Sequence, residues 1–271
     1  MTDELRFRPD LYRGTADDYD RFRVGYPPAM MDDLVGRAEP SGSGRLLDLA
    51  CGTGQIAFAL AHHFGEVWAV DQEPNMVEVV RRKARAARIG HIRPMSAAAE
   101  GLAAESESFE LVAIGNAFHR LDREAVASRV LGWLQPGRCV ALCWASAPWV
   151  GDHDWQRAMS ATLERWKTTV AARDRVPEGW KRIREERPDA SILQEARYEL
   201  VGSYRFPTEQ RWTISELVGF ASSTSFLPRT VLGDLAGRFE ADLTGELSAY
   251  ESAGMLLETI DFAYELARRP A

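Results

Sequence analysis

The fold is decided by the stretch Leu46-Leu47-Asp48-Leu49-Ala50-Cys51-Gly52-Thr53-Gly54-Gln55, which reads as an apolar strand, a turn with two glycines and the start of a helix. Gly52 and Gly54 carry no β-carbon, so the backbone of this turn can come into contact with a ligand. The helix that follows directs its unpaired N–H groups toward the same place. The stretch therefore predicts a small-molecule cradle at the carboxyl end of a strand.

The composition is that of a folded protein with an acidic surface. The chain has 271 residues, of which 45% are hydrophobic, and a formal net charge of −7. These values suit one large domain or one domain with a cap, and they disfavour a broad nucleic-acid-binding face. Since the chain has no run of about 18 apolar residues and residues 1–6 are polar, we expect neither a membrane span nor a secretory signal.

The chain has three cysteines, at positions 51, 139 and 143, and so low and uneven a number does not suit a disulfide framework. Their count indicates a reducing compartment, so we expect a cytoplasmic protein. Cys139 and Cys143 share one apolar run that reads as a strand, which separates them by roughly 13 Å. That distance excludes a shared metal or disulfide, and we expect small buried hydrophobic side chains and no metal site.

Strands and helices alternate from residue 45 onward. Short apolar runs predict five strands, at 45–50, 66–70, 91–95, 109–115 and 138–144. Helices are expected at 28–38, 54–64, 75–88 and 123–134. This βαβ order predicts an α/β fold with a doubly wound, mostly parallel sheet and right-handed crossovers.

The pattern changes after Trp144. Residues 150–195 read as helical, a capping box at 213–216 opens another helix, and a further helix is expected at about 229–243. Two segments, 197–206 and 258–266, alternate apolar and polar residues with a period of two. They predict a late antiparallel strand pair at the sheet edge, which gives seven strands and a helical cap.

Four ordered motifs carry a resemblance to a known family over roughly residues 12–145. They are Asp-Leu-Ala-Cys-Gly-Thr-Gly at 48–54, Val-Trp-Ala-Val-Asp at 67–71, Ser-Ala-Ala-Ala-Glu-Gly-Leu at 96–102 and Phe-Glu-Leu-Val-Ala-Ile-Gly-Asn-Ala-Phe-His at 109–119. With these motifs the chain resembles the class I S-adenosylmethionine-dependent methyltransferases, whose core is Rossmann-like. The Tyr19…Arg23…Tyr26-Pro27 spacing and the Ala117-Phe118-His119 triplet resemble the small-molecule branch (methyltransferase type 11) that includes trans-aconitate methyltransferase-like enzymes.

The resemblance implies S-adenosylmethionine as cofactor and S-adenosylhomocysteine as product. Asp71 ends the second strand, and its carboxylate offers two acceptor oxygens to the ribose hydroxyls. Ala50 stands where the family has its first glycine, a departure that requires only a negative φ. The other cofactor contacts implied in this part of the chain are Asp48, Gly52, Gly54, Gln55 and, beside the adenine, Gln72 and Met76.

The adenine and methionine ends of the cofactor are implied less directly. Many relatives carry an aspartate where Ala98 stands, so the backbone of the stretch Ala98, Ala99 and Glu100 would take over that contact. At the end of the fourth strand, the methionine half and the methyl-transfer site would be lined by Asn116, Ala117 and Phe118.

In this branch an N-terminal segment folds over the cofactor, which would put Arg23 at the methionine carboxylate and Tyr19 at the sulfonium. The chain then divides into a cofactor-covering segment (1–44), an S-adenosylmethionine-binding core (45–145) and a helical substrate cap that includes the last two strands (146–271).

His119 is the candidate catalytic residue, because a histidine at a strand end beside the cleft suits a general base. It could equally pack or position a substrate without taking a proton. Asp122 could orient His119, although capping the next helix explains it better. Trp144, Trp149 and Trp155 either wall an aromatic substrate pocket or form the core of the cap.

We expect methyl transfer to an oxygen or nitrogen of a small organic molecule, such as a specialised metabolite, by a monomer or homodimer without nucleic-acid or membrane partners. Two alternatives stay open. Gly52-x-Gly54-x-x-Ala57 also fits a loose dinucleotide fingerprint with Asp71 as its ribose acid, which would make the chain a nicotinamide-dependent oxidoreductase. The other alternative is a non-catalytic S-adenosylmethionine-binding module.

Overall fold

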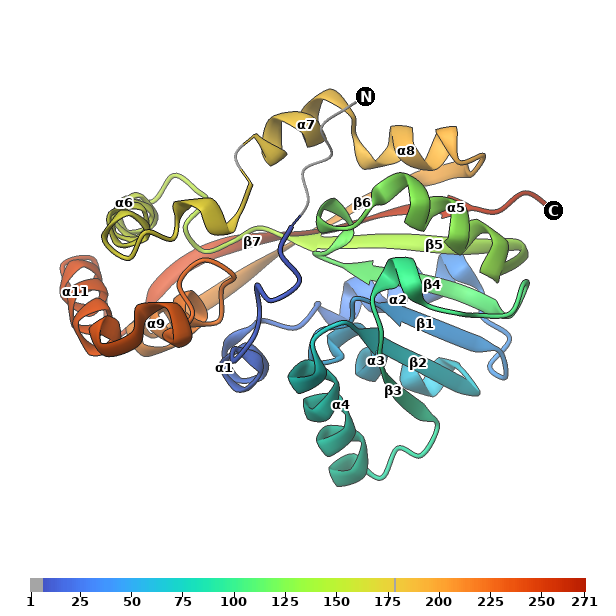
Figure 1. The fold of residues 1–271 in the computed structure, drawn as a ribbon, viewed down its shortest axis with the longest axis horizontal. Helices are drawn as coiled ribbons and strands as arrows, with labels where there is room; N and C mark the ends of the chain where they lie inside the picture. The colour runs from blue at the N-terminus through green and yellow to red at the C-terminus, as the bar shows by residue number, and fades with distance from the viewer. Residues whose placement is uncertain (1–6, 178) are drawn as a thin grey trace.

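A computed structural model describes residues 7–177 and 179–271 (Figure 1). Residues 1–6, for which the sequence predicts no secretory signal, lie outside this part of the chain. Within the described ranges, no helix combines the length and the apolar character that crossing a membrane requires.

Seven strands form one sheet in the order β3-β2-β1-β4-β5-β7-β6. The first five pair in parallel, and the last two run antiparallel to their neighbours. The predicted fold class, a Rossmann-like doubly wound sheet with a late antiparallel pair, is therefore confirmed. The strands are β1 (Arg45–Leu49), β2 (Glu66–Asp71), β3 (Ile92–Ser96), β4 (Phe109–Gly115), β5 (Leu134–Ala145), β6 (Glu199–Trp212) and β7 (Leu256–Arg268).

Helices cover both faces of the sheet because alternate side chains of its strands point to opposite sides. Leu46 of β1 packs in one hydrophobic core with side chains of α2 (Pro28–Ala38), α3 (Gln55–Leu60) and α4 (Pro74–Ala87). On the other face, Leu47 and Leu49 pack in a second core with side chains of α5 (Arg123–Trp133) and α8 (Asp189–Glu195).

A helical cap lies at the far end of the long β6–β7 pair (Figure 1). Its main helices are α6 (Asp154–Thr169), α9 (Ile214–Ser222) and α11 (Ala236–Ser248). The capping box predicted at 213–216 is confirmed, because the Glu216 N–H donates to Thr213 Oγ1 at 3.2 Å and the Thr213 N–H donates to Glu216 Oε2 at 2.8 Å.

Several boundaries differ from the sequence-based expectation. The single helix expected at 229–243 is wrong: α10 (Arg229–Leu232) ends at Gly233, whose φ of 53° leaves the helical region, and α11 starts three residues later. β5 begins at Leu134, before the predicted 138, because Leu134 already pairs with Phe109. Two short helices were not delimited by the sequence, α1 (Ala16–Phe22) and α7 (Trp180–Glu186).

The three cysteines are free and buried, and the burial of Cys139 and Cys143 was predicted. In the described part of the chain, no three His, Cys, Asp or Glu side chains come together as a metal site would need.

Candidate functional site

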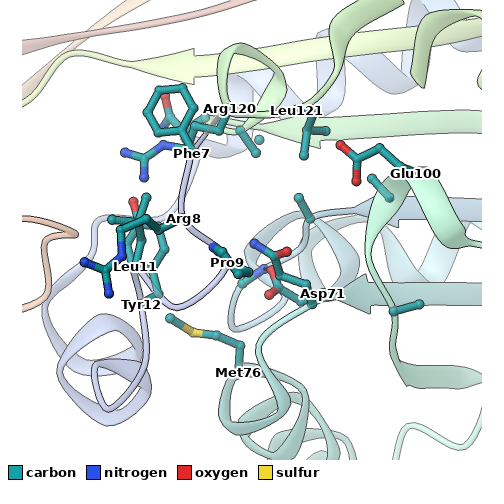
Figure 2. Close-up of a pocket in the computed structure, with 18 of the residues that line it drawn as sticks. Phe7, Arg8, Pro9, Leu11, Tyr12, Asp71, Met76, Glu100, Arg120 and Leu121 are labelled. Carbon is teal, nitrogen blue, oxygen red and sulfur yellow. Dashed lines mark hydrogen bonds between the residues drawn. The ribbon is translucent and has the colours of Figure 1, made fainter. Parts of the chain in front are cut away.

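A cavity of about 400 Å³ opens at the carboxyl ends of the parallel strands (Figure 2). The strand order reverses between β1 and β4, and such switch points are where open α/β sheets bind ligands. The volume falls in the range of small-molecule sites, about 300–1,000 Å³. From the ends of β1 and β2 the cavity is lined by Ala50, Gly52, Asp71, Gln72 and Met76.

The glycine turn after β1 leaves room for an aromatic side chain. Gly52 has a φ of 55°, and a β-carbon there would lie 3.4 Å from the Tyr19 ring. Ala50 has a φ of 57°, so the expectation of a negative φ is wrong. An alanine in this left-handed region crowds its β-carbon against the carbonyl that follows, and the turn therefore carries backbone strain.

The Asp71 carboxylate joins two loops at the edge of the cavity. The Gly52 N–H donates to its Oδ2 at 2.8 Å, and the Glu73 N–H donates to its Oδ1 at 2.8 Å. Burial raises the pKa of Asp71, while both N–H donors act in the opposite direction. Each oxygen accepts one hydrogen bond here and keeps acceptor capacity for a ligand hydroxyl.

Asp48 lies beneath the turn and outside the cavity lining. Its side chain is 1% exposed, and its Oδ2 accepts the Ala57 N–H at 2.8 Å. The third N–H of α3 is thereby satisfied, as helix N-termini require. Burial raises the pKa of Asp48 to about 7, and the nearby Asp71 charge adds to this shift.

Gln55 and Gly54 also lie outside the lining. The Gln55 amide donates to the backbone carbonyls of Arg23 and Val24, at 3.4 and 3.3 Å. Gln55 therefore ties the first helix of the core to the N-terminal segment.

The ends of β3 and β4 supply the third wall of the cavity. Asn116 has a φ of 51°, and its Oδ1 accepts the Ala145 N–H at 3.2 Å. Of the predicted adenine stretch, Ala99 and Glu100 line the cavity and Ala98 does not; of the methionine stretch, Asn116 and Ala117 line it and Phe118 is buried elsewhere. This wall consists of Ala97, Ala99, Glu100, Gly115, Asn116, Ala117, Arg120, Leu121 and Asp122.

Asp122 caps α5, as predicted. Its Oδ1 accepts the Ala125 N–H at 3.0 Å, and its own N–H donates to Glu100 Oε1 at 3.1 Å. The carboxyl group that could have oriented His119 is thus engaged with backbone.

The N-terminal segment forms the fourth wall. Tyr19 lines the cavity, and it packs edge-on against Tyr12 with ring centroids 5.8 Å apart. Of the residues in this wall, only Tyr19 was named as a candidate site residue from the sequence, although aromatic and basic residues before the Tyr19…Arg23 spacing are a visible signal. The lining residues from this segment are Phe7, Arg8, Pro9, Leu11, Tyr12 and Tyr19.

Arg23 lies outside the lining and contacts the cap. Its Nε donates to Ser223 Oγ at 2.8 Å and its Nη2 donates to the Ser223 carbonyl at 3.2 Å. The guanidinium lies between the rings of Tyr19 and Phe220, at 4.7 and 4.3 Å. In this structure Arg23 therefore fastens the N-terminal segment to the end of α9.

His119 lies beside the main cavity, in a narrow recess that also includes Trp144. Its ring stacks on Trp180 at 4.8 Å, and its Nε2 accepts the Arg120 Nε–H at 3.2 Å. Burial and the neighbouring arginines lower the pKa of His119 to about 2. A ring with so low a pKa is a weak proton acceptor near neutral pH.

The other two tryptophans belong to the cap. Trp149 packs edge-on against Phe220 and Phe226. Trp155 is 5% exposed and donates its indole N–H to the Leu257 carbonyl at 3.2 Å. Neither of them lines the cavity, so they lie in the core of the cap and not in the wall of a substrate pocket there.

Comparison with known sequences identifies the core. Residues 46–137 match the family model described as a methyltransferase domain. An uncharacterized methyltransferase of Mycobacterium tuberculosis is 31% identical over 126 residues, which are 46% of this chain and 48% of that protein. The chain spans about half the length of the curated relatives it matches.

Solved structures share the fold across most of the chain. A candidate type II methyltransferase of Anaeromyxobacter dehalogenans has a TM-score of 0.59 at 19% identity, over 91% of this chain and 97% of that one. A phosphoethanolamine N-methyltransferase of Haemonchus contortus, solved with phosphomonomethylethanolamine and S-adenosylhomocysteine, has a TM-score of 0.54 at 17% identity, over 94% of this chain and 57% of that one.

The strain at Ala50 predicts that Ala50→Gly stabilises the protein. Glycine adopts a left-handed φ without the steric strain of alanine, and this relief exceeds the conformational entropy that glycine adds to the unfolded chain. We therefore expect the free energy of unfolding to rise by about 0.5–1 kcal/mol. Urea unfolding in the absence of ligand measures it. Ala86→Gly, at an exposed helical position of α4, is the control and should lower stability; equal losses in both variants would contradict the strain.

The buried Asp48 predicts a pH-dependent difference in stability between the natural protein and Asp48→Asn. Its pKa is raised above the unfolded value, so its ionisation removes stability as pH rises from about 4 through 7, at up to about 1.4 kcal/mol per pH unit. The asparagine keeps an acceptor for the Ala57 N–H and cannot ionise. Between pH 5 and pH 8, the free energy of unfolding of the variant should rise relative to that of the natural protein. A difference that stays constant with pH would refute the raised pKa.

Proposed function

We propose that this chain, a class I S-adenosylmethionine-dependent methyltransferase by its domain at residues 46–137, transfers a methyl group from S-adenosylmethionine to a small organic molecule. The observation that carries the proposal is the Asp71 carboxylate at the cavity edge. Two backbone N–H groups fix it at 2.8 Å while it retains acceptor capacity, which suits it to hold a ribose diol.

The residues around the cavity fit the implied cofactor. Gly52 leaves its turn open beside Tyr19, and Gln72 and Met76 lie next to Asp71 on the wall where an adenosine would rest. Asn116 and Ala117 would face the methionine half. When bound, S-adenosylmethionine supplies a methyl group already activated by its positive sulfur, and the protein contributes alignment and exclusion of water.

We propose a division of labour along the chain. Residues 1–44 cover the cofactor, 45–145 bind it, and 146–271 form the cap that selects the acceptor. The support is that residues 7–9, Leu11, Tyr12 and Tyr19 line the cavity, while Arg23 donates hydrogen bonds to Ser223 of the cap. Covering and cap would thus act as one unit over the bound donor.

The acceptor chemistry in this proposal does not use His119 as a base. Its pKa is lowered to about 2 and its Nε2 already accepts a hydrogen bond. An oxygen acceptor that is already ionised, or a neutral amine with a route for proton loss, needs no general base. We therefore propose an oxygen or nitrogen acceptor of this kind.

We propose that the protein acts in the cytoplasm on a small metabolite, without nucleic acid, as a monomer or homodimer. The free, buried cysteines are compatible with a reducing compartment, and the net charge of −7 opposes binding to a polyanion.

Binding of S-adenosylhomocysteine is the first test. Isothermal titration should give a dissociation constant in the micromolar range for S-adenosylhomocysteine and no measurable heat with NADH. Binding of NADH alone would replace the proposal with a nicotinamide-dependent oxidoreductase. Tight binding of S-adenosylhomocysteine without turnover on any acceptor would favour a non-catalytic module.

The role of Asp71 is tested by Asp71→Asn. Hydrogen bonds to a charged group contribute about 1.5–3 kcal/mol, so losing the charge should weaken S-adenosylhomocysteine binding about 10- to 100-fold in the same titration. Glu73→Gln is the matched control. It also removes one negative charge, two residues after Asp71, but the Glu73 side chain does not line the cavity. Equal affinity in the natural protein and Asp71→Asn would remove the assigned ribose contact.

A further inference from the structure

Arg120 brings a positive charge into the cavity wall without a matching anion. It lines the cavity, and its Nη1 is buried and has no hydrogen-bond partner among the described residues. Its Nε donates to His119 Nε2 at 3.2 Å. A guanidinium has five N–H donors, and a buried donor left unpaired is costly.

Two aromatic rings lie near the Arg120 guanidinium. Its central carbon lies 5.0 Å from the Tyr12 ring centroid and 5.7 Å from that of Phe7. Figure 2 shows Arg120 beside Phe7, at the other side of the cavity from Asp71 and Met76. Such contacts stabilise the cation through the ring faces but accept no conventional hydrogen bond, so they leave the N–H groups available.

The acids that line the cavity are already engaged elsewhere. Asp71 accepts two backbone N–H groups, Asp122 caps α5, and Glu100 accepts the Asp122 N–H. Among the described residues none forms an ion pair with Arg120. The second lining arginine, Arg8, differs because it is paired with Asp10 at 2.9 Å.

We infer that Arg120 binds an anionic group of carboxylate type on a molecule held in the cavity. The inference rests on the proposed function, since it assigns a residue of the same site. A planar guanidinium matches a carboxylate with two parallel hydrogen bonds, which would satisfy the unpaired donor and neutralise the charge together.

Two molecules could supply this carboxylate: the amino-acid end of the donor, or the acceptor. Arg23, the residue that the family resemblance implies for the donor carboxylate, already directs two nitrogens at Ser223. Of the two arginines that line the cavity in the described part of the chain, Arg120 is the one with a buried nitrogen that lacks a hydrogen-bond partner, whichever molecule brings the anion.

His119 acts as a positioning residue for Arg120. Its Nε2 is an acceptor only while the ring is neutral, and burial among arginines keeps it so. The stacked Trp180 ring restrains the imidazole in turn. The guanidinium is therefore held at its Nε, while its Nη1 has no hydrogen-bond partner among the described residues.

The test compares the natural protein with Arg120→Leu and Arg120→Lys by isothermal titration. The probes are S-adenosylhomocysteine, 5′-methylthioadenosine, which lacks the amino-acid carboxylate, and benzoate added to protein saturated with S-adenosylhomocysteine. Benzamide serves as the uncharged partner of benzoate. Arg13→Gln, an exposed charge outside the lining, is the protein control, and thermal unfolding verifies that each variant is folded.

If the donor supplies the anion, Arg120→Leu weakens S-adenosylhomocysteine binding at least 10-fold and leaves 5′-methylthioadenosine within 2-fold, with Arg120→Lys intermediate. If a second molecule supplies it, S-adenosylhomocysteine binding is unchanged and benzoate binding is lost while benzamide is unaffected. The inference is overturned if no carboxylate probe distinguishes the natural protein from Arg120→Leu, or if both nucleosides weaken equally. Failure of the natural protein to bind S-adenosylhomocysteine would instead overturn the proposed function.

Discussion

The Asp71 carboxylate is the interaction on which the site depends. It ends β2 and receives N–H groups from two separate loops, at Gly52 and at Glu73. The turn after β1 and the start of the loop before α4 are therefore fixed relative to each other. Without this carboxylate, the N–H groups of Gly52 and Glu73 would lose their acceptor at the cavity edge.

A second acid stabilises the same turn from below, at a cost. Asp48 satisfies the third N–H of α3 but is almost wholly removed from water, which raises its pKa to about 7. The next turn residue, Ala50, adopts a left-handed φ of 57°. Backbone strain at Ala50 and burial of a carboxyl group at Asp48 thus occur side by side, just below and within the turn that borders the cavity. The hydrophobic core around β1 holds both residues in these conformations.

Charge is distributed unevenly around the cavity. Asp71 lies at the end of β2, whereas Arg120 lies near the rings of Phe7 and Tyr12, on the wall that also includes Glu100 and Asp122. A ligand with polar hydroxyls at one end and an anion at the other would match this arrangement. The N-terminal segment contributes both the aromatic rings and the contact from Arg23 to Ser223, so the chain before β1 joins donor site and cap.

Local patterns of a few neighbouring residues were enough to predict the parallel strands, the glycine turn, the acid at position 71 and the late antiparallel pair. Other features follow from the three-dimensional arrangement alone: Arg23 contacts Ser223, 200 residues away, residues 7–9, Leu11 and Tyr12 line the cavity, and Arg120 lines it while donating to His119. The tertiary structure also decided the φ of Ala50 and the helix break at Gly233. These features depend on contacts between distant segments, and no local periodicity encodes such contacts.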